Sequence, residues 1–262
     1  MTDTLPTDKT VPFGFEDIAA EEKEGRVRSV FDSVASRYDL MNDFMSAGIH
    51  RLWKHDTIAK LNPQPGEALL DVAGGTGELA KAFLERADRA EKRRQVARPA
   101  SAIVCDINEE MLKAGQARSD MQKYGDRIDW ICGNAEALPF EDRSFDALTI
   151  SLGIRNVTHR DKALSEFRRV LKPAGRLAIL ELSHMTAPLL QQAYDAYSFN
   201  VIPSIGGLVT GDRDSYQYLV ESIRRFPDQD TFRREVETAG FSSVSVTNFS
   251  GGIAALHFGW AV

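Results

Sequence analysis

The sequence predicts an α/β fold with a mixed sheet and an N-terminal helical extension. Short apolar runs typical of strands alternate with segments of helical periodicity between residues 67 and 183. Two closely spaced strand-like runs, 241–249 and 251–262, end the chain and indicate a hairpin added to the sheet. Because strands that alternate with helices form βαβ units, we expect most of the sheet to be parallel.

The expected elements follow from the spacing of apolar residues. Five core strands and three intervening helices are expected, the strands at 67–73, 101–107, 127–133, 144–151 and 175–183, and the helices at 77–87, 109–124 and 161–171. The charged segment 88–101 predicts a solvated loop. Helices at 216–226 and 230–240 precede the hairpin.

The domain organisation is expected to be simple, since 262 residues suit one large α/β domain. Residues 1–24 are polar and predict a flexible N-terminal segment. Residues 25–62 predict two helices, 63–183 a ligand-binding core, and 184–262 substrate-side helices with the terminal hairpin. These three parts are expected to form a single domain, 25–262.

Composition excludes several classes of function. With 43% hydrophobic and 27% charged residues the chain resembles an ordinary globular protein, and its net charge of −6 argues against nucleic acid as a partner. The N-terminal residues lack the pattern of a signal peptide, and no apolar run reaches about 18 residues, so a cytoplasmic protein is expected. Cys105 and Cys132 lie in strand-like runs and predict buried free thiols, with no metal site.

A glycine-rich loop follows the first core strand. That strand contains Asp71 and is followed by Gly75, Thr76 and Gly77 at the start of a helix, an arrangement that lets the backbone approach a ligand closely. The spacing also fits a dinucleotide fingerprint, so a nicotinamide-dependent oxidoreductase is a rival. A carboxylate at Asp71 suits the sulfonium and ammonium of S-adenosylmethionine better than a pyrophosphate.

Two further strand ends carry polar residues. Asp106 ends the second core strand, where a carboxylate can accept hydrogen bonds from ribose hydroxyls, although Asp106 or Asn108 can instead cap the next helix. Asn134 and Ala135 follow the third core strand, at the edge where an adenine is expected to lie. These residues favour the methyl donor over the dinucleotide.

Together these motifs resemble the class I S-adenosylmethionine methyltransferases, and longer stretches resemble one family. The segments 38–54, 151–183, 193–209 and 214–231 are similar to the bacterial ubiquinone/menaquinone biosynthesis C-methyltransferases, and the resemblance extends from Phe31 to the C-terminus. It implies a Rossmann-like, seven-stranded mixed sheet. Two departures are Ala174, where the family usually has glycine, and a longer basic loop before Pro99.

The resemblance implies a reaction and its site. A methyl group of S-adenosylmethionine is expected to pass to a ring carbon of a polyprenylated benzoquinol or naphthoquinol. Matched position by position, cofactor contacts are implied at Thr76, Asp106, Asn134, Ala135 and Ser151. The substrate's prenyl tail implies transient contact with the inner face of the cytoplasmic membrane. Partnership with other quinone-biosynthesis enzymes and a homodimer are left open.

Catalysis requires the ring carbon to become nucleophilic, which happens when a neighbouring hydroxyl ionises. Arg155 and Asn156 follow a strand end at the expected ligand edge and are candidates for stabilising the phenolate. Tyr38 and His50 are candidates for orienting the quinol or relaying its proton, and for His50 a packing or capping role is an equal alternative. A non-catalytic scaffold that binds the cofactor or a quinone is a third reading of the chain.

Overall fold

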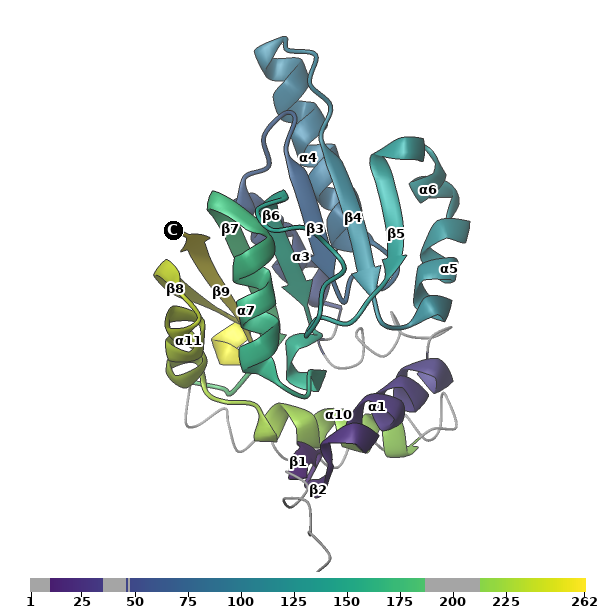
Figure 1. Cartoon of the computed structure of the whole chain (residues 1–262), viewed down its shortest axis with the longest axis vertical. Helices are drawn as coiled ribbons and strands as arrows, with labels where there is room; N and C mark the ends of the chain where they lie inside the picture. The colour runs from purple at the N-terminus through teal and green to yellow at the C-terminus, as the bar shows by residue number, and fades with distance from the viewer. Residues whose placement is uncertain (1–9, 35–45, 47, 187–212) are drawn as a thin grey trace, which may run out of the picture.

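Among the residues that the computed structural model describes, 10–34, 46, 48–186 and 213–262, seven strands form the central sheet (Figure 1). In order across the sheet they are β5 (Ile128–Cys132), β4 (Ser101–Asp106), β3 (Ala68–Val72), β6 (Phe145–Ser151), β7 (Leu171–Leu182), β9 (Ala254–Ala261) and β8 (Phe241–Phe249). Strand β9 is antiparallel to β7 and β8, and the other neighbours are parallel. The predicted mixed sheet is confirmed.

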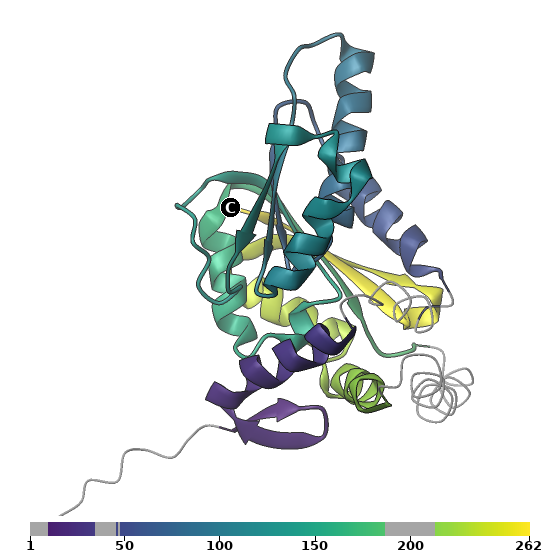
Figure 2. The same ribbon diagram turned by 90° about the vertical axis from the view of Figure 1, so that its right-hand side faces the viewer.

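Helices cover both faces of the sheet (Figure 2). One face carries α3 (His50–Leu61), α4 (Glu78–Arg94), α5 (Glu109–Ala117) and α6 (Ser119–Gln122), and the other carries α7 (Arg160–Val170) and α11 (Gln229–Thr238). Because side chains alternate along a strand, Leu69 of β3 packs on the first face while Leu70 and Val72 pack on the second.

Helix α4 is longer than the sequence predicted. It continues to Arg94, so the charged segment expected to be a loop supplies two further helical turns, and only the residues after Gln95 connect it to β4. Gln95 ends the helix with a left-handed φ of 56°. Its buried residues, such as Ala87 and Ala90, lie at helical spacing within a run of charges that hid the pattern.

Two helices and a small hairpin lie beyond the carboxyl ends of the parallel strands (Figures 1 and 2). These are α1 (Ala20–Val34), α10 (Arg213–Arg225) and the antiparallel pair β1 (Thr10–Phe13) and β2 (Glu16–Ala19). The three-residue helices η2 (Gly125–Arg127), η3 (Ile154–Asn156) and η5 (Ser250–Gly252) lie in connections. Residues 35–45 and 47, within the segment 25–62 predicted to form two helices, lie outside the described residues.

The hairpin corrects the expectation that residues 1–24 form a flexible segment, as far as residues 10–24 are concerned. Val11 is buried, and the ring of Phe13 stacks on Tyr218 of α10 with centroids 4.2 Å apart. Asp17 pairs with Arg225 at 3.2 Å. The stabilising partners are about two hundred residues away along the chain, so no local pattern could reveal them.

Two positions of the sheet bear on the sequence predictions, Cys132 and the alanine that stands where the family usually has glycine. Cys105 is a buried thiol as predicted, but Cys132 is exposed because β5 is an edge strand. Ala174 lies where the pairing register between β6 and β7 shifts, and it has a φ of 62°, a conformation that favours glycine. The backbone therefore has a glycine-type conformation despite the alanine.

Candidate functional site

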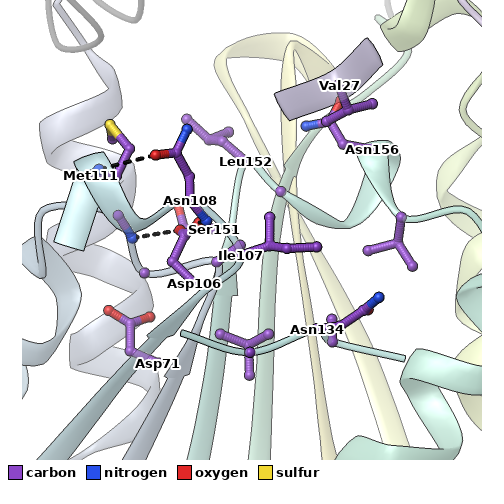
Figure 3. A pocket seen from close by; sticks show the side chains of 18 of the residues that line it. Val27, Asp71, Asp106, Ile107, Asn108, Met111, Asn134, Ser151, Leu152 and Asn156 are labelled. Atoms are coloured by element: carbon purple, nitrogen blue, oxygen red, sulfur yellow. Dashed lines mark hydrogen bonds between the residues drawn. The ribbon is translucent and has the colours of Figure 1, made fainter. Parts of the chain in front are cut away.

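A cavity opens at the carboxyl ends of β3, β4, β5 and β6, the edge of the sheet where open α/β folds bind ligands (Figure 3). Two groups of residues enclose it. The loops that follow these strands form the strand-end wall, at 71–76, 78–79, 106–108, 111, 133–136, 151–153 and 156–158. Glu24, Val27 and Arg28 form the α1 wall, and Lys54 of α3 completes the lining.

The glycine loop brings its backbone to the cavity. Gly75 has a φ of 54°, and its N–H donates to Asp106 Oδ2 at 2.9 Å, which ties the loop to the end of β4. Gly75 and Thr76 line the cavity, whereas Gly77 lies behind it as the residue preceding α4. A Cβ at Gly77 would lie 2.7 Å from Met121 and 2.8 Å from Trp130, so this glycine serves packing.

Asp71 lines the cavity from a fully enclosed position. Its Oδ1 accepts a hydrogen bond from the hydroxyl of Thr149 at 2.7 Å, and its Oδ2 accepts one from the N–H of Ala80 at 3.2 Å. Burial raises the pKa of Asp71 to about 7, against the opposing effects of these hydrogen bonds and of Lys54. A bound cation would favour ionisation of this carboxyl group, and a bound pyrophosphate would oppose it.

Asp106 and Asn108 have separate tasks, which resolves the capping alternative. Asn108 is the N-cap of α5, and its side-chain oxygen accepts from the N–H groups of Glu110 and Met111. Asp106 instead accepts from the N–H groups of Gly75 and Asn108, both at 2.9 Å. Burial raises the pKa of Asp106. The backbone N–H of Ile107 also hydrogen-bonds to this carboxyl group, and a carboxylate with about four acceptor sites can still accept a hydroxyl.

Asn134, Ala135 and Ser151 also line the cavity. The side-chain oxygen of Asn134 accepts from the N–H of Glu136 at 2.8 Å, and its amide nitrogen donates to Glu24 at 3.1 Å. Ser151 Oγ is buried and has no hydrogen-bond partner among the described residues. An unsatisfied hydroxyl at a cavity wall is suited to a polar ligand atom, because leaving it unpaired costs free energy.

Arg155 is not where the sequence analysis expected it. Its side chain is only 2% exposed and does not line the cavity. The guanidinium forms an ion pair with Glu181 at 2.7 Å and donates to the carbonyl of Leu152. Its positive charge is thus neutralised inside the protein, between η3 and β7, and the role of Arg155 in stabilising substrate charge stays a prediction.

The other catalytic candidates have different positions. Asn156 lines the cavity, and its side-chain oxygen accepts a hydrogen bond from the hydroxyl of Tyr218 at 3.0 Å. His50 is buried at the start of α3 with Nδ1 3.0 Å from Ser46 Oγ, and it is not among the residues that line the cavity. Tyr38 lies outside the described residues.

The sequence did not reveal the α1 wall or the charges beside the glycine loop. Three contacts hold α1 over the strand ends: Lys23 to the carbonyl of Val157, Glu24 to Asn134, and Arg28 to the carbonyl of Ile107. On the α3 side of the cavity, the Lys54 ammonium donates a hydrogen bond to the carboxylate of Glu78 at the start of α4. Lys54 belongs to the segment 38–54 that carried the family resemblance, which was its one available signal.

Among the described residues no cluster of histidine, cysteine and acidic side chains is suited to hold a metal ion. In the same part of the chain, no helix combines the length and the apolar character needed to cross a bilayer.

Comparison with solved structures identifies the fold. A SAM-dependent methyltransferase from Thermotoga maritima superposes with a TM-score of 0.58 at 17% identity, covering 89% of this chain and 99% of that one. A SAM-dependent methyltransferase from Aquifex aeolicus gives 0.55 at 15% identity, covering 80% and 89%. At these identities the likeness concerns the fold, which is that of the class I methyltransferases.

Comparison with known sequences goes further. Over 98% of both chains, 54% of residues are identical to the "Ubiquinone/menaquinone biosynthesis C-methyltransferase UbiE" of Cereibacter sphaeroides. The protein of the same name from Caulobacter vibrioides is 54% identical over 95% of this chain and 97% of its own. The model of the ubiE/COQ5 methyltransferase family matches residues 19–261. The chain therefore belongs to the ubiE/COQ5 methyltransferase family.

Proposed function

We propose that this protein transfers a methyl group from S-adenosylmethionine to a ring carbon of a polyprenylated quinol in ubiquinone or menaquinone biosynthesis. The substrates proposed are 2-polyprenyl-6-methoxy-1,4-benzoquinol and demethylmenaquinol. The observation that carries this proposal is the 54% identity, over 98% of both chains, to a relative named for that reaction. Neither the oxidoreductase reading nor the scaffold reading finds support in these comparisons.

The residues of the strand-end wall fit the methyl donor. S-adenosylmethionine supplies an electrophilic methyl group on a sulfonium when it is bound. Asp106 would accept from the ribose hydroxyls, and Asn134 with Ala135 would contact the adenine. The acidic character of the wall, from Asp71 and Asp106, suits a ligand with two positive centres, and the unpaired Ser151 hydroxyl offers a polar contact.

Asn156 would orient the quinol oxygen that becomes the phenolate. The hydroxyl of Tyr218 occupies its side-chain oxygen, so the amide presents its NH₂ group, which only donates. A donor at this position would stabilise an oxygen that gains negative charge. Since Arg155 is committed to Glu181, we assign the direct polar contact with substrate to Asn156.

A methylation assay tests the reaction. Purified protein, S-adenosylmethionine labelled in its methyl group and a short-chain demethylated quinol should give a product methylated at a ring carbon. A label on oxygen, or no product from protein that binds S-adenosylhomocysteine normally, would overturn the assignment. Asn156→Ala should lose most of kcat while keeping cofactor affinity, and Tyr218→Phe should cause a smaller loss because it only releases the amide.

A polyprenyl substrate also leads us to propose that the protein visits the inner face of the cytoplasmic membrane. Ile49 and Leu52, at the start of α3, are 39% and 64% exposed and could enter the lipid surface. Sedimentation with anionic vesicles should recover the protein, and Leu52→Ser should reduce the bound fraction. Contacts with other quinone-biosynthesis enzymes and a homodimer stay predictions.

A further inference from the structure

The charged pair at the glycine-loop end of the cavity has no role in the site described so far. Lys54 Nζ lies 2.5 Å from Glu78 Oε2, and both side chains line the cavity. The two are 14% and 28% exposed, so they face the ligand space without being open to bulk water. Lys54 comes from α3, and Glu78 is the first residue of α4.

Linking α3 to α4 does not by itself account for this ion pair. Because desolvation offsets much of the attraction between partly buried charges, the pair is weak evidence for a purely stabilising role. Glu78 alone would suit the start of α4, where a negative charge is favoured, but a lysine beside that helix end is unfavourable and needs another reason. Charge from Lys54 helps hold the pKa of Glu78 low and opposes the upward shift in the pKa of Asp71.

The charges that line the cavity are distributed unevenly. Arg28, the other basic residue of the lining, donates to the carbonyl of Ile107 after β4. Of these two lining residues, Lys54 is the one next to the glycine loop, where Asp71 and Glu78 supply two carboxyl groups. Arg118 also reaches this loop and donates to the Thr76 hydroxyl, but it does not line the cavity. An adjacent positive and negative group form a dipole, and a ligand with the opposite dipole would complement both charges at once.

We propose that Lys54 and Glu78 bind the amino-acid end of the methyl donor. The ammonium of Lys54 has three donors and uses one on Glu78, so it can also donate to the α-carboxylate of the ligand. The Glu78 carboxylate has a second oxygen that can accept from the α-ammonium group. This assignment rests on the methyl donor of the proposed function. It adds the residues that would recognise the amino-acid part of that ligand, which a plain nucleoside lacks.

Calorimetric titration with three ligands tests the assignment without any quinol. S-adenosylhomocysteine carries both charged groups, its decarboxylated analogue keeps only the ammonium, and 5′-methylthioadenosine carries neither. Lys54→Met should weaken S-adenosylhomocysteine about 10- to 100-fold, as expected for losing a charged hydrogen bond. It should change 5′-methylthioadenosine less than threefold and abolish the preference for S-adenosylhomocysteine over the decarboxylated analogue.

Glu78→Gln separates the two roles, since it should weaken both ammonium-containing ligands and spare 5′-methylthioadenosine. Lys60→Met is the matched control, because Lys60 lies on the same helix but over the ring of Phe258, outside the cavity. It should change none of the three affinities.

Equal losses for all three ligands in Lys54→Met would show that the pair only maintains the structure, and unchanged affinities would show that it does not contact the ligand. Either result overturns the assignment. If Lys54→Met does not fold, Lys54→Gln is used in the same titrations. Because these measurements need no quinol, their failure is distinct from failure of the methylation assay, which bears on the acceptor.

Discussion

The strand-end wall and the α1 wall enclose the same cavity but are held in place by different interactions. Residues of the strand-end wall follow buried parallel strands and are fixed by short internal hydrogen bonds, such as Gly75 N–H to Asp106. The α1 wall is held by side-chain contacts of one helix. The 3.1 Å contact of Glu24 with Asn134 is partly exposed, whereas Lys23, which donates to the carbonyl of Val157, is buried. One wall is therefore fixed by the core of the sheet, and the other is positioned by the packing and side-chain contacts of a single helix.

Breaking the buried ion pair of Arg155 with Glu181 should produce the largest loss of stability. Arg155→Ala leaves Glu181 charged and unpaired in the core and should lower the free energy of unfolding by about 3–5 kcal/mol in urea titrations. The matched double variant Arg155→Met with Glu181→Leu removes both charges and should cost clearly less. A stable Arg155→Ala protein that has lost only turnover would restore the catalytic role that the sequence suggested.

Asp71, in the strand-end wall, should make the stability of the protein depend on pH. Its folded-state pKa of about 7 lies above the ordinary value of 3.8, so between those pH values the folded state holds a proton that the unfolded state lacks. The contribution of Asp71 to the free energy of unfolding should therefore decline as pH rises from about 4 to 7. Asp71→Asn should lack this decline in urea titrations at pH 5 and pH 7.

The same carboxyl group links pH to binding. A cationic ligand favours its ionised form, so the affinity of wild-type protein for S-adenosylmethionine should rise between pH 6 and pH 8. Asp71→Asn should show a flatter profile by calorimetry. Parallel profiles for the two proteins would mean that Asp71 does not sense the ligand charge.

Opening of the α1 wall should have a modest effect. Glu24→Ala removes the contact with Asn134, and because the Glu24 side chain is about half exposed the loss is limited to about 1 kcal/mol, or roughly fivefold in affinity for S-adenosylhomocysteine. The change should lie in the dissociation rate measured by stopped flow. Glu21→Ala, on an exposed position of α1, is the control. Dissociation as slow as in wild type would show that this wall does not retain the cofactor.

The smallest effect is expected far from both walls. Ala174→Gly removes the steric cost of an alanine in the left-handed conformation, but it also gives the unfolded chain more conformational freedom. The net result should be an increase of about 0.5–1 kcal/mol in the free energy of unfolding. Thermal unfolding measures the gain, and cofactor affinity should not change. A loss of stability would mean that the alanine methyl group makes a favourable contact.

Much of the strand-end wall was predictable. The residues that the sequence singled out as cofactor contacts and that line one cavity are Asp71, Gly75, Thr76, Asp106, Asn134, Ala135 and Ser151. Each follows a strand whose apolar run is visible locally, and parallel strands bring their carboxyl ends to one edge of the sheet. Gly77 belongs to the same loop, but its packing on Trp130 depends on a distant strand.

The α1 wall and the charged partners were not predictable. Arg155 and Asn156 are neighbours in sequence, yet one side chain is buried against Glu181 and the other lines the cavity. The position of the Lys54 side chain could not be predicted either, because its carboxylate partner is on another helix.

The sequence by itself determined the α/β order, the glycine loop, the methyl donor and the family, because these depend on local periodicity and on motifs within a few residues. Only the tertiary structure decided which charges line the cavity, because that depends on pairs such as Arg155 with Glu181 and Lys54 with Glu78. The partner of a charge sets whether it is neutralised in the core or available in the cavity, and the chain brings partners together only by folding.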